Sequence, residues 1–316
     1  MPDSSLTVRI QSSIMFSMNS LPTATRVRIL AAIVEGNSLR ATARMSGVSF
    51  NTVLKFVADF GPVCEDYHDA HVRGLRTERV QADEIWAFCY AKDKNLPAHM
   101  RGQPGVGSVW TWTAIDSDSK LMVSWMVGDR DAECATRFLK DLAGRLGNRV
   151  QLTTDGHHVY ERAVVAAFGW DVDYAQLVKI YGAPREHEQR YSPCECVGAK
   201  PMPVIGRPVR EDISTSHVER SNLTMRMGMR RFTRLTNGFS KKLANHRAAV
   251  AIHFMHYNFC RVHKTLRVTP AMEAGIADHV WELAELVGIL EAQERATVGT
   301  EANKRGPYKK AAKSSN

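Results

Sequence analysis

Three acidic residues lie far apart in the sequence, each at a place where a carboxylate has a particular cost or use. Asp83 lies inside an apolar stretch, VQADEIWAFCYA, that predicts a buried strand. Asp155 ends another such stretch, RVQLTTDG, and Glu219 stands near the start of a basic helical segment. Burying an unpaired carboxylate is costly unless a cation compensates it. A salt bridge to an arginine would explain one such acid, whereas three acids placed inside one predicted strand, at the end of another and on a later helix favour a shared metal site.

Carboxylate oxygens are hard ligands that suit Mg²⁺ or Mn²⁺. Two such ions can activate a water or a 3′-hydroxyl and stabilise the leaving oxygen in an in-line phosphoryl transfer. We therefore expect Asp83, Asp155 and Glu219 to be both the metal ligands and the catalytic residues of one site. Glu84 is the nearest rival of Asp83, but adjacent strand residues point to opposite faces, so only one of the two is expected to face the site.

A long one-signed charge pattern follows the third acid. Residues 220–267 contain eleven Lys or Arg and no Asp or Glu. A solvated helix normally mixes both signs, and a stretch this basic repels itself unless a polyanion such as nucleic acid lies against it. Three of its residues follow Glu219 at helical spacing and three more extend the same surface. We expect these six to contact DNA: Asn222, Arg226, Arg230, Arg231, Lys241 and Lys242.

The composition of the 316-residue chain agrees with a basic, reduced cytoplasmic protein. The net charge is +9 and there are six cysteines, which are scattered. Cys194 and Cys196 form a Cys-x-Cys pair, but without a second pair such spacing seldom marks a metal site. The sequence has no apolar run long enough to cross a membrane. The expected location is the cytoplasm.

The elements that must position these acids follow an alternating order. From residue 78 to 270, three predicted strands are followed by a helix, a strand, a second helix and a fifth strand, with an irregular insertion at 182–216. This order is that of an RNase H-like core, so the fold class is mixed α/β with a five-stranded sheet. In such a sheet the first and fourth strands are neighbours, which would bring Asp83 and Asp155 to one edge of the sheet.

A small all-α region is predicted at residues 20–62. Three short helical patterns follow one another there, and Gly47 makes the turn between the second and third, as in a helix-turn-helix. The third helix is expected to bury Phe50 and to enter the major groove with its first residues. An ordinary three-helix bundle without a ligand is the alternative. The predicted DNA contacts are Ser49, Asn51, Thr52 and Lys55.

The C-terminal part is predicted to be a single helix and a tail. Thr269 and Pro270 are typical of an N-cap followed by proline in the first turn, so a helix is expected over 271–300. The tail at 301–316 is short and basic, and it is predicted to be disordered.

The segments VQADEIWAFCYAK, VQLTTDGHHVY and SHVERSNLTMRMGMRRFTRLTNGFSKK resemble those of DDE transposases from bacterial insertion sequences, in the family that takes its name from insertion sequence one. The run from Glu219 to Arg226 is its most specific element, and the resemblance covers roughly residues 20–310. It implies that Asp83, Asp155 and Glu219 are the catalytic triad, that Mg²⁺ is the cofactor and that terminal inverted repeats are the substrate. It also implies a location in the bacterial cytoplasm, in association with the nucleoid. The zinc motif that some members carry before the helix-turn-helix has no counterpart here.

The hypothesis from the sequence is a DNA transposase. It would bind element ends through its N-terminal helices, cleave them to expose 3′-hydroxyls and join them to target DNA, as a homo-oligomer that pairs two ends. Its partner would be double-stranded DNA, both terminal inverted repeats and target, and not a membrane. Two alternatives stay open: an RNase H-like nuclease that cuts without joining, and a non-enzymatic helix-turn-helix DNA-binding protein.

Overall fold

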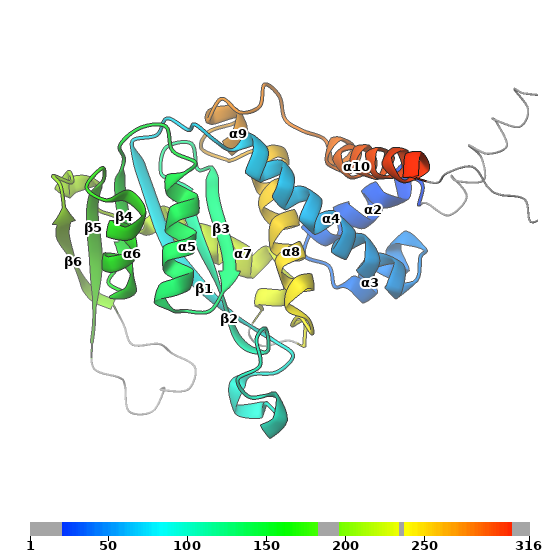
Figure 1. The fold of residues 1–316 in the computed structure, drawn as a ribbon, viewed down its shortest axis with the longest axis horizontal. Coiled ribbons are helices and arrows are strands. Elements are labelled where there is room, and N and C mark those ends of the chain that lie inside the picture. Colours follow the sequence, from blue (N-terminus) through cyan, green and yellow to red (C-terminus); the bar gives the residue numbers. More distant parts are fainter. Residues whose placement is uncertain (1–20, 183–195, 234–236, 305–316) are drawn as a thin grey trace, which may run out of the picture.

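A computed structural model of the chain describes residues 21–182, 196–233 and 237–304. The protein is a mixed α/β structure built on one six-stranded sheet with the strand order β3-β2-β1-β4-β5-β6 (Figure 1). The strands are β1 (Arg79–Cys89), β2 (Gly107–Asp116), β3 (Met122–Gly128), β4 (Gln151–Asp155), β5 (Asp173–Tyr181) and β6 (Cys196–Ile205).

The first three strands form an antiparallel meander, and β4 pairs in parallel with β1, as the predicted core requires. The prediction of five strands is wrong by one, because β6 pairs antiparallel with β5 at the edge of the sheet. This strand lies within the segment 182–216 that was expected to be irregular. Its sequence, CVGAKPMPVI, hides the strand because it lacks apolar alternation and holds two prolines. Proline is tolerated on an edge strand, where one side of the ladder is unpaired.

Helices cover both faces of the sheet. α5 (Ala132–Ala143) and α6 (Val159–Phe168) lie on one face, where Trp112 of β2 packs edge-on against Tyr160 with ring centroids 5.6 Å apart (Figure 1). α7 (Ser216–Gly228) packs on the other face. The apolar stripe predicted as core is buried together with Ile85 of β1, but α7 carries only part of it. Val218 and Met225 lie on α7, Met229 follows its last residue, and Phe232 ends the next short 3-10 turn.

The N-terminal helices stand at the opposite end of the molecule from β6 (Figure 1). They are α2 (Thr23–Val34), α3 (Leu39–Ser46) and α4 (Phe50–His71). Between the last two, Gly47 adopts a left-handed conformation with φ of 68°. α4 does not end near residue 62, where the N-terminal region was predicted to end. It continues to His71 and packs against α8 (Leu243–Met255).

Two helices replace the single helix predicted over 271–300. The expected cap is present, since the Thr269 hydroxyl accepts a hydrogen bond from the amide of Met272, but α9 (Pro270–Glu273) is only four residues long. Gly275, with φ of 70°, follows it and turns the chain away. α10 (Leu283–Lys304) then packs against α2, where Glu294 pairs with Arg26 at 2.9 Å.

Short helical turns complete the described structure. Four are 3-10 turns and one, which continues α8, is a π-turn: η1 (Asp93–Asn95), η2 (Ala98–Met100), η3 (Arg210–Asp212), η4 (Arg230–Phe232) and the π-turn η5 (His256–Cys260). Across the ranges that the structure describes, no helix combines the length and apolarity needed to cross a membrane.

The contact between α4 and α8 depends on a glycine. A Cβ added at Gly61 would lie 2.2 Å from the Cα of Ala248, far inside the normal separation of two carbon atoms that are not bonded to each other. Gly61→Ala is therefore expected to push the helices apart and to lower the free energy of unfolding by about 1–3 kcal/mol, measured by urea denaturation. Gly288→Ala in α10 is the matched control, because no atom lies within 4 Å of its added Cβ. It should leave stability unchanged or raise it slightly, and an equal loss in both variants would contradict the argument.

Candidate active site

Two of the three predicted acids meet where β4 ends. β1 and β4 are paired only as far as Ala82 and Thr154, so Asp83 and Asp155 are the next residues along each strand. Carboxylate oxygens of Asp83, Glu84 and Asp155 all lie within 4.8 Å of one another. We call these three residues the acidic cluster. The structure therefore brings Asp83 and Asp155 together, with Glu84 as an additional member.

Glu84 reaches the cluster from the other face of the sheet. Its side chain is directed toward α6, where the Tyr160 hydroxyl donates to Oε2 at 2.9 Å and Arg130 Nε donates to Oε1 at 2.5 Å. The expectation that only one of the two adjacent acids reaches the site is wrong. Side chains do alternate along β1, but β4 is too short to separate the faces beyond Thr154. Carboxylates from both faces can therefore meet in the gap.

Asp83 is held by α7 from its own side of the sheet. Asn222 Nδ2 donates to Asp83 Oδ2 at 2.9 Å, and the Thr113 hydroxyl lies 3.3 Å from the amide oxygen of Asn222. Burial, and then the charges of Glu84 and Asp155, raise the pKa of Asp83 to about 7. Burial and the charge of Asp155 also raise the pKa of Glu84, against the lowering effect of Arg130.

The pKa values of Asp83 and Glu84 are raised first by burial and then by the neighbouring carboxylates. A divalent cation would remove both the desolvation cost and the mutual repulsion. The donors are hard carboxylate oxygens only, as Mg²⁺ and Mn²⁺ prefer. The acidic cluster thus fits a divalent metal ion by its chemistry.

Glu219 is positioned near this site but is not part of the acidic cluster. The side chain of Gln81 accepts hydrogen bonds from the amides of His217 and Val218, at 2.8 and 3.2 Å, and so fixes the first turn of α7 to β1. In the next position, Glu219 accepts a hydrogen bond from the Thr215 hydroxyl and pairs with Lys179 Nζ of β5 at 2.7 Å. Its carboxylate is therefore directed to Lys179.

The six residues expected to contact DNA from the basic segment do not form one exposed row. Asn222 is buried against Asp83, and the Arg231 guanidinium donates to the Ser240 hydroxyl at 2.6 Å, with burial lowering its pKa to about 10. α7 ends at Gly228, so Arg230 lies in η4 rather than on the same helix as Glu219. Arg230, Lys241 and Lys242 are exposed and Arg226 is half-buried.

The predicted DNA contacts of α4 divide in a similar way. Asn51 and Lys55 are exposed, and Lys55 pairs with Asp59 at 2.6 Å on the same helix. The Ser49 hydroxyl caps α4 by accepting a hydrogen bond from the amide of Thr52 at 3.1 Å. Part of its capacity to bind DNA through hydrogen bonds is therefore already used.

Phe50, expected in the core, is 38% exposed, and the Arg40 guanidinium carbon lies 5.2 Å from its ring centre. It stands at the first residue of α4, before the helix meets the rest of the core. This part of the expectation is wrong.

Sequence reasoning missed two cations of the site. Lys179 is a lysine within an apolar strand, DYAQLVKIY, which is the signal that singled out Asp83. Arg130 lies in the loop before α5, and its guanidinium carbon stands 4.7 Å from the ring centre of Trp110. Loop position gave Arg130 no comparable signal.

Cys196, the described member of the Cys-x-Cys pair, is exposed without a disulfide, whereas Cys194 lies outside the described residues.

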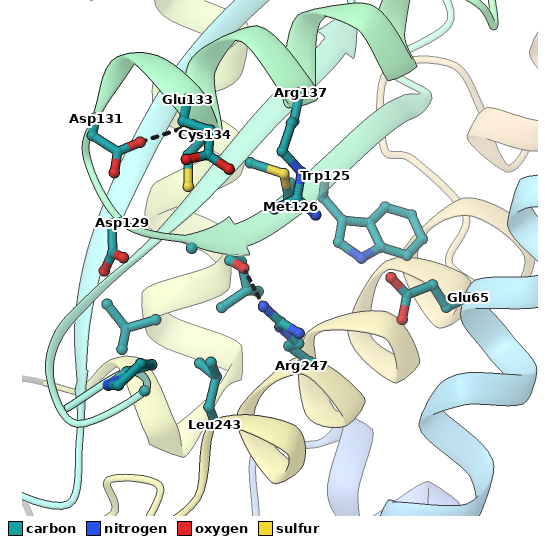
Figure 2. A pocket seen from close by; sticks show the side chains of 15 residues that line it. Glu65, Trp125, Met126, Asp129, Asp131, Glu133, Cys134, Arg137, Leu243 and Arg247 are labelled. Atoms are coloured by element: carbon teal, nitrogen blue, oxygen red, sulfur yellow. Dashed lines mark hydrogen bonds between the residues drawn. The ribbon is translucent and has the colours of Figure 1, made fainter.

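A pocket of about 350 Å³ lies apart from the acidic cluster, between β3, α5 and α8 (Figure 2). Some of its polar side chains serve the fold. Arg247 Nη2 donates to the carbonyl of Val127 at 3.1 Å, and Asp131 caps α5 by accepting from the amide of Cys134 at 2.8 Å (Figure 2). None of the clustered acids lines this pocket, so the pocket is separate from the candidate active site at the acidic cluster.

Neither a protein-family model nor a curated protein matches the sequence. Among solved structures, the chain is similar to the Mos1 strand transfer complex, with 15% identity, 54% of this chain and 67% of that chain covered, and a TM-score of 0.21. The Mos1 transposase paired-end complex with the left transposon end has the same identity, coverage and TM-score. The Mos1 mariner paired-end complex with Mn is 14% identical over 48% of this chain and 58% of that chain, again with a TM-score of 0.21. These similarities are too weak to carry a conclusion about function.

Proposed function

We propose that this chain is a DDE-type DNA transposase that cuts at the ends of an insertion sequence and joins them to target DNA. One observation carries the proposal. The oxygens of Asp83, Glu84 and Asp155 lie within 4.8 Å of one another at the open end of β4, next to the helix that begins the acid-free basic segment. A carboxylate site for divalent metals beside a polyanion-binding surface suits phosphoryl transfer on nucleic acid.

In this proposal Asp83, Asp155 and Glu219 hold Mg²⁺ or Mn²⁺, which when bound activates the attacking oxygen and stabilises the leaving one. Asn222 orients the Asp83 carboxylate through the 2.9 Å hydrogen bond to Oδ2. Glu84 stays with Arg130 and Tyr160 and adds negative charge that favours the cation. The resemblance of the segments around Asp83, Asp155 and Glu219 to transposases of the insertion-sequence-one family supports this assignment.

DNA would be held at two places in the proposal. α3, the turn at Gly47 and α4 would act as a helix-turn-helix with Asn51 and Lys55 at the major groove. Arg226, Arg230, Lys241 and Lys242 would hold phosphates near the acidic cluster. Two copies of the chain would pair two element ends.

The test is a joining reaction with duplexes that carry the inverted repeats flanking the gene, a supercoiled target plasmid and Mg²⁺ or Mn²⁺. Metal-dependent joined products would support the proposal. Cut but unjoined ends would instead indicate a nuclease, and salt-sensitive binding without any metal-dependent product would indicate a DNA-binding protein. Glu161→Gln changes an exposed acid on α6 and is the matched control for substitutions in the acidic cluster. It should react like the wild type.

The helix-turn-helix assignment predicts distinct losses in DNA binding. Lys55→Ala should weaken binding to the repeat duplex and lower the salt slope by about one, whereas Asn51→Ala should reduce the preference for the repeat by roughly 1–3 kcal/mol. Asp59→Ala is the control, because it removes the partner of Lys55 without removing the cation. Fluorescence anisotropy between 50 and 300 mM salt, roughly the range where such slopes are measurable, would reveal them. Equal binding by wild type and Lys55→Ala at every salt concentration would refute the contact.

A further inference from the structure

The ion pair between Lys179 and Glu219 occupies a specific place in the sheet. Asp155 at the end of β4 is paired with Leu177 of β5, and Lys179 follows two residues later. Side chains two apart on a strand share a face, and that face also carries Asp83 and meets α7. Lys179 thus lies on the strand next to Asp155, on the face of the sheet that packs against α7 and Glu219.

The backbone of Glu219 is already placed for the acidic cluster. Gln81 of β1 fixes the start of α7, and Asn222 touches Asp83 at 2.9 Å. Glu219 precedes Asn222 by three residues, so the two lie on one side of the helix, roughly 5 Å apart along its axis. What keeps Glu219 out of the cluster is the direction of its side chain, which Lys179 and Thr215 hold.

The ammonium group of Lys179 is also partly shielded from solvent. Its Nζ lies 2.7 Å from the Glu219 carboxylate, and the lysine side chain is 28% exposed. The ammonium group is therefore a partly shielded cation on the face of the sheet that carries Asp83. It supplies positive charge at the edge of a site that is otherwise short of it.

We infer that Lys179 is a positioning residue. In the metal-free protein it holds Glu219 away from the acidic cluster, and it releases Glu219 when a divalent ion binds there. Without the metal, the ammonium group neutralises Glu219. When the metal is bound, Glu219 turns to the acidic cluster and Lys179 is released beside it, where it can pair with a DNA phosphate. This inference rests on the proposed function, since it takes the acidic cluster as the metal site.

The test measures the binding of Mn²⁺ to the full-length, DNA-free protein by isothermal titration calorimetry. Lys179→Met keeps the length of the side chain and removes the competing cation, so Mn²⁺ should bind about tenfold more tightly than to the wild type. Lys179→Arg keeps the charge and should stay within roughly twofold. Glu219→Gln should bind Mn²⁺ more weakly than the wild type.

The double variant Lys179→Met, Glu219→Gln separates an exchange from a simple charge effect. If Lys179 acts by holding Glu219, its removal should bring little gain once Glu219 is an amide. If the lysine only repels the metal through space, the tenfold gain should persist in the double variant, and the inference is overturned. Mn²⁺ affinity that is unchanged or weaker in Lys179→Met would overturn it as well, and thermal unfolding in EDTA would verify that each variant is folded.

Failure of the proposed function has a different signature. Asp83→Asn would then bind Mn²⁺ as tightly as the wild type, whatever Lys179→Met does. Loss of binding in Asp83→Asn together with unchanged affinity in Lys179→Met would retain the metal site and reject the role of Lys179. An absence of Mn²⁺ binding by both wild type and Lys179→Met would reject the two together.

Discussion

Asp83→Asn and Asp155→Asn are each expected to reduce joining of the repeat duplex to target DNA by about 10³-fold or more, roughly 4 kcal/mol in the barrier. Each change replaces a charged oxygen ligand by a neutral amide of the same shape. In the metal-free protein the same change removes repulsion, because burial and the neighbouring charges raise the pKa of Asp83 to about 7. Asp83→Asn should therefore fold at least as well as the wild type above pH 7, which thermal unfolding in EDTA would show.

The two glutamates should behave differently in the same assay. Glu219→Gln is expected to fall to the level of Asp83→Asn. Glu84→Gln should retain more of the joining rate, losing about tenfold, since Glu84 acts through its charge and its bonds to Arg130 and Tyr160. Wild-type joining in Glu219→Gln with none in Glu84→Gln would make Glu84 the third ligand. Full activity in Asp83→Asn and Asp155→Asn would remove the acidic cluster from the chemistry altogether.

The part of this site that could be predicted from sequence is the part that depends on strand order. Apolar stretches typical of buried strands mark β1 and β4, and parallel pairing of the first and fourth strands places Asp83 beside Asp155. Both conclusions follow from local patterns and a small set of possible topologies. They needed no knowledge of side-chain contacts.

The role of Glu84 depends on how far β4 extends, and local sequence patterns predict the length of a strand poorly. β1 has eleven residues and β4 only five, so the sheet opens just where the two acids stand. Ends of elements are the least predictable feature of a sequence. The pairing of Lys179 with Glu219 joins residues forty positions apart, and nothing in either segment specifies that contact.

The missed elements have the same origin. β6 is exposed along most of its length and interrupted by prolines, so pairing with β5 rather than apolar burial defines it. α9 has a good N-cap but ends where Gly275 takes a left-handed conformation. In both cases, backbone geometry set by the neighbours decides the outcome.

Acid is expected to destabilise the protein steeply, because buried histidines must stay neutral: burial lowers the pKa to about 3 for His68, His246 and His253 and to about 4 for His256. His68, 2% exposed, lies with Nε2 3.1 Å from the carbonyl of Met122 and Nδ1 3.4 Å from the Arg145 guanidinium. His246 is fully buried, with Nδ1 3.1 Å from the Ser240 hydroxyl that also binds Arg231. Burial, and then the adjacent arginine, lowers the pKa of each histidine to about 3.

The sign follows from proton binding. Below pH 6.5 the unfolded chain takes up protons at all four of these histidines, whereas the folded protein does not until the pH reaches about 3 to 4. Stability is therefore complete above the unfolded pKa and is lost as the pH falls, at a limiting rate of about 1.4 kcal/mol per pH unit for each histidine.

Urea denaturation in EDTA at pH 7.5, 6.5 and 5.5, roughly one unit apart across that window, should show the free energy of unfolding falling between the last two. His68→Gln and His246→Gln should each remove about a quarter of the histidine contribution to this dependence, because His253 and His256 have similarly lowered pKa values, while His99→Gln on the exposed loop before β2 should not alter it. A free energy of unfolding that stays level down to pH 5.5, or an equal slope in all three variants, would mean that these two side chains are not the groups that acid titrates.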